Sequence, residues 1–216
     1  PRFNGARYYA GWNEQVDYRN NVVYNWGFNS AYGAEPSDID GIKAKYNIVN
    51  NYYKSGPATN SGVSYRIIEP SRQDDVTGAG YSYFYIEGNY ATARPEVFEY
   101  NWELGVQGVT SSEKEDMMIL APFPHEPITE HSAIEAFEHV LAYSGCILPN
   151  RDSLDERIIF ETLTGTASYG ESYGLGGNGI IDSQTDVGGW PELQSTTPPD
   201  DTDHDGQQNI VVLIVM

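Results

Sequence analysis

Several features that would classify the chain quickly are scarce or missing. The sequence holds a single cysteine, Cys146, so no disulfide can form within the chain and cysteine usage does not identify a redox compartment. No apolar run reaches the ~18 residues of a membrane-spanning helix, and no export-signal pattern is visible. The chain starts at Pro1 in place of methionine. We therefore expect an internal piece of a longer protein, long enough for one domain plus a tail.

Basic residues are also scarce. The sequence has 12 Lys and Arg against 31 Asp and Glu, a net charge of −19, which speaks against a general nucleic-acid binder. The imbalance is uneven, because residues 1–72 carry 8 basic and 6 acidic side chains, whereas residues 73–216 carry 4 and 25. An anionic ligand would therefore bind to the first third of the chain.

The residues that are abundant favour short strands. The chain has 17 tyrosines and 22 glycines, a composition typical of strands separated by tight turns. We expect strands at residues 16–18, 21–24, 46–49, 64–68, 81–86 and 97–100.

Asparagines recur at the ends of these strands. Asn20 and Asn21 follow one strand, Asn50 and Asn51 follow another 30 residues later, and Asn89 occupies a weaker third copy after a further 38 residues. This spacing indicates stacked coils. In a parallel β-solenoid such asparagines form a ladder that satisfies buried polar groups, so we interpret them as architectural and not catalytic.

The middle of the chain is predicted to be helical. Residues 133–143 have helical apolar periodicity, with Thr129 or Ser132 as N-cap and Gly145 as terminator. A second helix is expected at residues 152–164. The expected apolar faces are formed by Ile134, Phe137, Val140 and Leu141, and by Leu154, Ile158, Ile159 and Leu163.

The end of the chain carries a pattern of alternating acids. Asp201, Asp203 and Asp205 are followed by Gly206, an arrangement in which three carboxylates can wrap a calcium ion. Position 12 of the loop is Val212, where a calcium loop would have Glu. A calcium-binding repeat and a merely solvated acidic tail both stay open. The apolar residues 210–216 fit an edge strand, an aggregation-prone end or a truncation.

The first segment resembles a known signature. Pro1-Arg2 and Arg7 precede Arg19-Asn20-Asn21-Val22-Val23-Tyr24-Asn25-Trp26 and Asn29-Ser30-Ala31-Tyr32-Gly33. This ordered series resembles pectate lyases of polysaccharide lyase family 1, and segments at 153–158, 164–167 and 182–191 resemble the C-terminal portion of its bacterial secreted members. The resemblance covers about residues 1–53 and 129–206.

The resemblance implies an all-β fold, a right-handed parallel β-helix of which this chain would be the distal coils with a short helical segment and a loop-rich tail. We expect β-helix coils at 1–125, a helical cap at 126–168, a Gly/Pro-rich extended region at 169–199 and an acidic, calcium-binding tail with an apolar end at 200–216. It also implies a secreted, cell-surface or periplasmic monomer without a membrane span.

The resemblance further implies calcium-dependent β-elimination of polygalacturonate, in which an arginine removes the C5 proton. In the R-x-P-R motif that arginine stands two residues before the proline, so it would precede Pro1 and the chain alone would be inactive. Arg2 matches the following motif arginine and Arg7 a further one, and both are candidates for binding substrate carboxylates, with structural salt bridges as the alternative. Trp26 and Tyr32 are interpreted as packing residues, with sugar stacking as the alternative.

Two other classes of function stay open. The first is a non-catalytic β-helical carbohydrate-binding or adhesin module, and the second is a calcium-stabilised structural surface protein that depends on Asp201, Asp203 and Asp205. A hydrolase is less favoured, because hydrolysis needs two carboxylic residues flanking the bond and the first segment has no such pair at a recognisable spacing.

Overall fold

Parallel β-strands dominate the computed structural model, which describes residues 2–3, 14–37, 41–74, 78–148, 150–170 and 178–192. The described strands form three sheets of three strands each, and every pairing between strands is parallel. The first sheet holds β1 (Arg2–Phe3), β4 (Tyr32–Gly33) and β7 (Glu69–Pro70). The second holds β2 (Gln15–Arg19), β5 (Lys45–Val49) and β8 (Tyr83–Glu87). The third holds β3 (Val22–Tyr24), β6 (Tyr52–Lys54) and β9 (Tyr90–Ala91).

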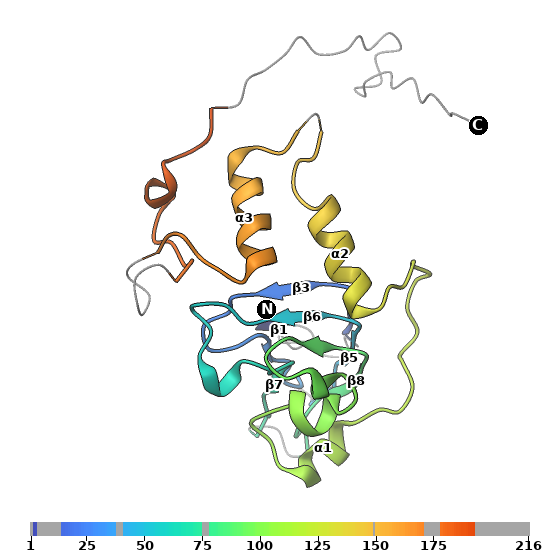
Figure 1. The fold of residues 1–216 in the computed structure, drawn as a ribbon. Coiled ribbons are helices and arrows are strands. Elements are labelled where there is room, and N and C mark those ends of the chain that lie inside the picture. The colour runs from blue at the N-terminus through green and yellow to red at the C-terminus, as the bar shows by residue number, and fades with distance from the viewer. Residues whose placement is uncertain are drawn as a thin grey trace, which may run out of the picture.

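The chain visits the three sheets in the same order in each repeat, so it forms coils that stack on one another (Figure 1). Register in the second sheet places Val16 beside Tyr46 and Tyr46 beside Phe84. The Tyr46 and Phe84 rings stack inside the coils at 5.1 Å between centroids, and Ile48 and Ile86 continue the core beside them. Equivalent positions of successive coils therefore build one continuous apolar interior.

An asparagine ladder runs through the bend between the second and third sheets. Asn21 Nδ2 donates to Asn51 Oδ1 at 2.9 Å, Asn51 Nδ2 to Asn89 Oδ1 at 2.9 Å, and Asn89 Nδ2 to Asn101 Oδ1 at 2.8 Å. The same oxygens accept the backbone N–H groups of Asn21, Asn51 and Asn89. The predicted architectural role of Asn21 and Asn51 is thus confirmed, and Asn101 is an additional rung that the spacing did not reveal.

The residue before each rung turns the chain. Asn20 and Asn50 adopt φ of 56° and 54°, and Gly88 occupies the same place in the next coil with φ of 67°. Asparagine and glycine tolerate this left-handed conformation better than other residues. A Cβ at Gly88 would overlap Asn50 Oδ1, so this coil has space only for glycine.

Two predicted strands are wrong. In the predicted strand 64–68, residues 64 and 65 lie in a turn. Only Ile68 pairs, through an isolated parallel bridge to Val106 just before β7. Residues 97–100 include the end of a 3₁₀-helix, Pro95–Phe98, followed by a π-helical turn at Asn101–Gly105. Pro95 stands at the start of the 3₁₀-helix, where its missing N–H costs nothing, while Val97 still reaches the core. β6, in contrast, was not among the predicted strands.

The helices are α1 (Ser111–Met117), α2 (Ala133–Tyr143) and α3 (Ser153–Thr164). α2 and α3 confirm the predicted helices, with Ser132 and Asp152 as their N-caps. The predicted buried faces need correction. Ile134 is 47% exposed while Ala133 and Ala136 are buried, and in α3 Ile158 and Leu163 are 48% and 56% exposed. No helix among the described residues is long and apolar enough to cross a membrane.

Candidate functional site

One outer face of the coils is covered by α2 and α3. The Phe137 ring of α2 stacks on Tyr52 of β6 at 4.3 Å, and the Lys54 ammonium lies 5.4 Å from the same ring. Lys54 Nζ also donates to the Leu163 carbonyl near the end of α3, and the Tyr24 hydroxyl donates to the Thr166 carbonyl just beyond it. These contacts fix both helices over the sheet of β3, β6 and β9 (Figure 1).

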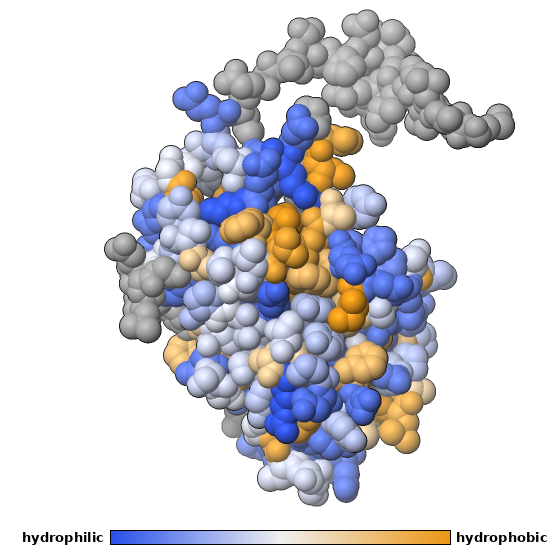
Figure 2. Space-filling model, in the orientation of Figure 1, coloured by the Kyte–Doolittle hydropathy of each residue, from blue (hydrophilic) through white to orange (hydrophobic). Residues whose placement is uncertain are grey.

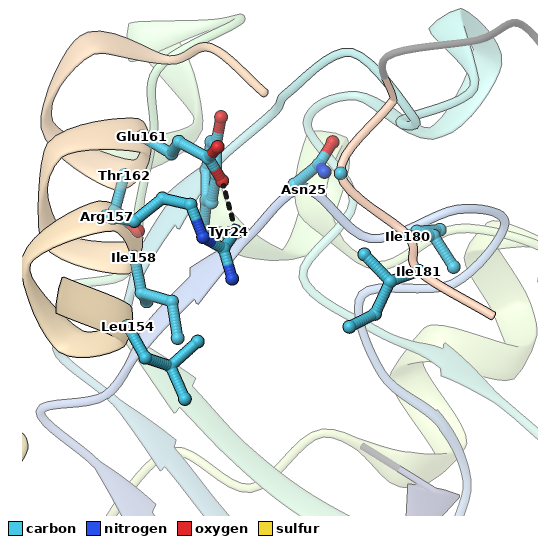
Figure 3. Close-up of a pocket in the computed structure, with 10 residues that line it drawn as sticks. Tyr24, Asn25, Leu154, Arg157, Ile158, Glu161, Thr162, Ile180 and Ile181 are labelled. Atoms are coloured by element: carbon cyan, nitrogen blue, oxygen red, sulfur yellow. Dashed lines mark hydrogen bonds and ion pairs between the residues drawn. The ribbon is translucent and has the colours of Figure 1, made fainter. Parts of the chain in front are cut away.

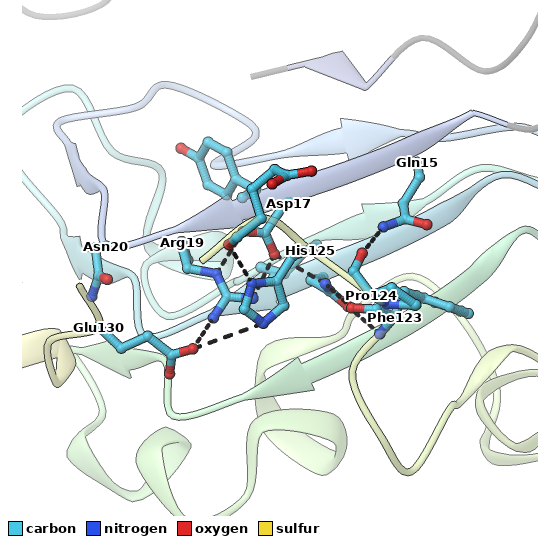
Figure 4. A network of polar contacts seen from close by, with 12 residues as sticks. Gln15, Asp17, Arg19, Asn20, Phe123, Pro124, His125 and Glu130 are labelled. Atoms are coloured by element: carbon cyan, nitrogen blue, oxygen red, sulfur yellow. Dashed lines mark hydrogen bonds and ion pairs between the residues drawn. The ribbon is translucent and has the colours of Figure 1, made fainter. Parts of the chain in front are cut away.

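A second outer face is covered by the segment 119–131, which leads from the last coil back to α2. It starts with the Ile119 N–H donating to the Phe84 carbonyl of β8. It then passes Asn47 of β5, which exchanges hydrogen bonds of 2.9 and 3.0 Å with the Phe123 backbone, and reaches Gln15 of β2, which donates to the Pro124 carbonyl (Figure 4). We call this segment the strap.

The strap is tied down by charge on β2. Arg19, whose side chain is 5% exposed, donates to Asp17 at 2.6 Å and to Glu130 of the strap at 2.7 Å (Figure 4). Burial alone would raise the pKa of Asp17, but the hydrogen bonds from Arg19 and Asn47 and the Arg19 charge outweigh it and lower the pKa below its usual value. This network attaches the strap across the outer face of the second sheet.

The third face, formed by β1, β4 and β7, keeps exposed polar side chains. Register places Arg2 in line with Tyr32, and Tyr32 in line with Glu69. The neighbouring line holds Gly33 and Pro70, which are buried. Tyr32 is 40% exposed and the Glu69 side chain 38%, so the Tyr32–Glu69 line faces outward. We call this surface the open face.

An arginine is clamped at the edge of the open face. Arg66 precedes β7, and its side chain is 12% exposed. Its Nη1 donates to Glu69 and to Asn29, and its Nε donates to Gln107 at 3.1 Å. These bonds leave the Nη2 group without a partner among the described residues. A guanidinium held this way can offer its remaining N–H groups to a carboxylate with little loss of side-chain freedom.

A polar cavity follows the end of β7. It measures about 340 Å³ and is lined by Lys43, Arg72, Gln73, Asp74, Gly78, Gly80, Tyr81 and Asp116. The Arg72 guanidinium lies 5.7 Å from the Tyr81 ring and pairs with Asp74. Two cations beside two acids give the cavity mixed charge, so an acidic sugar could bind through Lys43 and Arg72.

The predicted site residues are only partly placed. Arg2 lies in β1, at the register position next to Tyr32, and nothing further is described for its side chain. Arg7, Asp201, Asp203 and Asp205 lie outside the described residues. Trp26 is 7% exposed and packs edge-on against Tyr53, as the packing interpretation predicts, whereas Tyr32 lies at the surface. Arg66 and Glu69 were not predicted, and only the surplus of basic residues in 1–72 pointed toward them.

No group of three or more His, Cys, Asp or Glu that could hold a metal ion occurs among the described residues. The histidines pack locally, with His131 stacked on His139 at 4.3 Å and His139 on Tyr143 at 5.8 Å.

The chain is similar in sequence to pectate lyases. It is 31% identical over 192 residues to a probable pectate lyase C of Aspergillus terreus, 32% identical over 192 residues to one of Neosartorya fischeri, and 28% identical over 191 residues to one of Aspergillus flavus. Each alignment covers 88% of this chain and 39% of the relative, so the chain spans about two fifths of the relatives' length. No family model matches.

These relatives support the expected likeness to pectate lyases over most of the chain, beyond the segments that first indicated it. They are fungal proteins, so the finer resemblance to bacterial members of family 1 stays a prediction.

Proposed function

We propose that this protein is the distal part of a secreted pectate lyase that degrades polygalacturonate by calcium-dependent β-elimination, and that the described coils belong to a right-handed parallel β-helix. The observation that carries the proposal is the similarity of about 30% to proteins named probable pectate lyase C along 88% of the chain. The three parallel sheets, two of them covered and one open, agree with a binding surface on the side of stacked coils.

In this proposal the open face binds the polysaccharide. Polygalacturonate is a chain of anionic sugars, so its carboxylates would pair with fixed cations spaced along the surface. Arg66 offers its Nη2 group, and Arg72 and Lys43 line the adjoining cavity. Tyr32 adds an exposed ring on which a sugar face could lie. Arg2 and Arg7 remain proposed partners of substrate carboxylates.

The described residues do not fit the catalytic calcium ion that this chemistry uses. Glu69 is the acid on the Tyr32 line, and it is already paired with Arg66. The cavity acids are the pair Asp74 and Asp116, of which Asp74 is paired with Arg72. Calcium dependence therefore rests on residues outside the described part, and we assign this chain a role in holding substrate, as a monomer that is inactive in elimination on its own.

Binding and activity can be tested separately. The purified chain should bind trigalacturonate in isothermal titration calorimetry and should not bind neutral galactan of similar length, because the pairing depends on the sugar carboxylates. It should release no unsaturated product from polygalacturonate, followed by absorbance, with added calcium. A longer protein that includes the preceding segment should release product with calcium and lose that activity with a chelator.

Two results would overturn the proposal. Equal affinity for galactan and trigalacturonate would show that the open face does not recognise acidic sugars. Activity of the longer protein that persists with a chelator would contradict a calcium-dependent lyase, and its absence under all conditions, with binding retained, would favour the carbohydrate-binding module instead.

A further inference from the structure

The three tryptophans that the structure describes differ in their surroundings. Trp26 and Trp102 are 7% and 9% exposed and belong to the core of the coils, whereas Trp190 is 78% exposed. An exposed indole ring offers a flat apolar face together with one N–H donor. Such a ring can bind a ligand that is apolar on one side and polar on the other.

Trp190 lines a cavity of about 210 Å³ against α3. The segment 178–192 runs beside α3 on the side away from α2 (Figure 1), whereas hydrophobic residues gather between the two helices (Figure 2). Arg157 is the only charged side chain among the described residues that line the cavity. The walls that matter for binding are Leu154, Arg157, Tyr169, Val187, Trp190 and Pro191. A cavity with aromatic and aliphatic walls and one cation is typical of a ligand site.

Arg157 is held in place by a buried acid. Its Nη1 donates to Glu161 Oε2 at 3.2 Å, and the Glu161 side chain is 7% exposed (Figure 3). The other Glu161 oxygen accepts the Ser168 N–H at 2.9 Å, and the adjacent Tyr169 ring lies 5.3 Å from the Arg157 guanidinium. Within the described residues, Nε and Nη2 of Arg157 have no hydrogen-bond partner. These N–H groups can therefore bind a planar anion such as a carboxylate.

The loop that carries Trp190 is supported by its own backbone. Ser183 caps the 3₁₀-helix Gln184–Val187 through a hydrogen bond to its first turn. Gly188 and Gly189 follow with φ of 92° and 88°, a conformation that glycine adopts without strain, and their N–H groups donate to carbonyls of the helix. Because the loop is ordered before a ligand arrives, binding on Trp190 costs little conformational freedom.

We propose that this cavity is a second site for an acidic sugar, in which one galacturonate ring lies on Trp190 and its carboxylate binds Arg157. We call it the cap site. A hexuronate offers C–H groups on a ring face for the indole, a carboxylate for the free guanidinium N–H groups, and hydroxyls that stay in water. The choice of galacturonate rests on the proposed function, whereas the cavity and its groups do not.

The cap site and the open face are separate surfaces. α3 covers the third sheet, and the open face is formed by the first sheet. A polysaccharide long enough to reach both surfaces would bind more tightly than a trimer, because its second contact is intramolecular. The cap site would therefore keep this protein attached to the polymer without taking part in elimination.

Calorimetry with trigalacturonate tests the cap site apart from the open face. The starting protein is the chain with Arg66→Gln, in which binding at the open face is weakened. Binding to it should remain, and adding Trp190→Ala should weaken that binding at least about tenfold. Adding Phe160→Ala is the matched control, because Phe160 is 60% exposed on α3 and is not among the residues that line the cavity. Hydrogen exchange at residues 184–190 should slow with the sugar.

Arg157→Lys tests the contact with the carboxylate. Lysine keeps the charge beside Glu161 but lacks the planar pair of N–H groups. The preference for trigalacturonate over a neutral galactose trimer should therefore fall at least about fivefold. Urea denaturation of the same variant checks that the chain stays folded.

Three results would overturn the cap site: no binding of millimolar trigalacturonate to the Arg66→Gln chain, binding that is unchanged by Trp190→Ala, or equal affinity for the neutral trimer. The first two would leave the open face as the binding surface. If Arg66→Gln had no effect and Trp190→Ala abolished binding, the cap site would stand and the assignment of the open face would fail.

Discussion

Asn51 and Asn89 join two successive coils through a hydrogen bond of 2.9 Å between Asn51 Nδ2 and Asn89 Oδ1, and both residues are completely buried. Asn51 also accepts from Asn21 and donates to the Tyr18 carbonyl, so a single amide satisfies groups in three coils. A buried polar group with every partner in place stabilises one register of the coils and penalises any other.

Replacing Asn51 by alanine should therefore be costly. The backbone N–H and side-chain amide of Asn21 lose their acceptor, and Asn89 Oδ1 loses its side-chain donor while it keeps the backbone N–H of residue 51. We expect the free energy of unfolding to fall by about 2–4 kcal/mol, measured by urea denaturation. Asn60→Ala is the matched control, because this exposed asparagine only caps a short 3₁₀-helix and should cost less than about 1 kcal/mol. Equal losses in the two variants would contradict the ladder's role.

Gly88→Ala should destabilise the same bend for a different reason. Gly88 has φ of 67°, and an added Cβ would overlap Asn50 Oδ1 of the neighbouring coil. We expect a loss of about 1–3 kcal/mol in the same denaturation measurement. Gly62→Ala is the control, since its added Cβ would lie 3.4 Å from the nearest atom, Asn60 Oδ1, and the glycine does not have positive φ. If Gly88→Ala left the free energy of unfolding unchanged, the bend would be able to relax around the added Cβ.

The stability that Asp17 contributes by attaching the strap should be lost at acid pH. The lowered pKa of Asp17 means that its ionised form is favoured in the folded state, so its contribution is complete above the unfolded pKa of about 4 and is lost as pH falls through the lower folded value. Asp17→Asn should reduce the free energy of unfolding by about 1–2 kcal/mol at pH 7, and the difference from the unsubstituted chain should shrink below pH ~4. Glu99→Gln, on an exposed side chain away from the strap, should change little at either pH. If the stability difference between Asp17→Asn and the unsubstituted chain were the same at every pH, ionisation of Asp17 could not be its cause.

Arg66→Gln should weaken binding of acidic sugars. The substitution removes the charge that Asn29, Glu69 and Gln107 hold at the open face. We expect the affinity for trigalacturonate to fall about tenfold in calorimetry, the loss of one charge-assisted hydrogen-bonding partner. Arg94→Gln is the control, because Arg94 stacks on the Tyr65 ring at 5.1 Å and lies outside the clamp. If Arg66→Gln left the affinity for trigalacturonate unchanged, Arg66 would not be part of the binding surface.

Local signals in the sequence predicted several elements well. Ser132 and Asp152 begin α2 and α3 because capping depends on hydrogen bonds within one turn, which neighbouring residues decide. The paired asparagines likewise predicted stacked coils, since the same bend needs the same residue types each time. Equal spacing could not reveal Asn101, which follows Asn89 by only 12 residues and reaches the ladder from a helical turn.

Other features depend on partners far along the chain. Helical periodicity placed Ile134 in the buried face, but the sheet beneath α2 accepts the small Ala133 and Ala136 together with the Phe137 ring on Tyr52. Residue periodicity cannot show which side of a helix meets another element, because it records apolarity and not contact. The sequence could not predict the hydrogen bonds of Arg66 for the same reason, because its partners Asn29 and Gln107 are 37 and 41 residues away in the chain.

The sequence by itself determined the repeat of short strands, the asparagine bends, the two C-terminal helices and the likeness to pectate lyases, because each depends on residue type within a few positions. Only the tertiary structure decided which faces are covered, through Phe137 on Tyr52 and through Glu130 on Arg19, and which face stays open beside Arg66. It also decided that the ladder runs from Asn21 through Asn51 and Asn89 to Asn101, since hydrogen bonds between coils join residues that are distant in the chain.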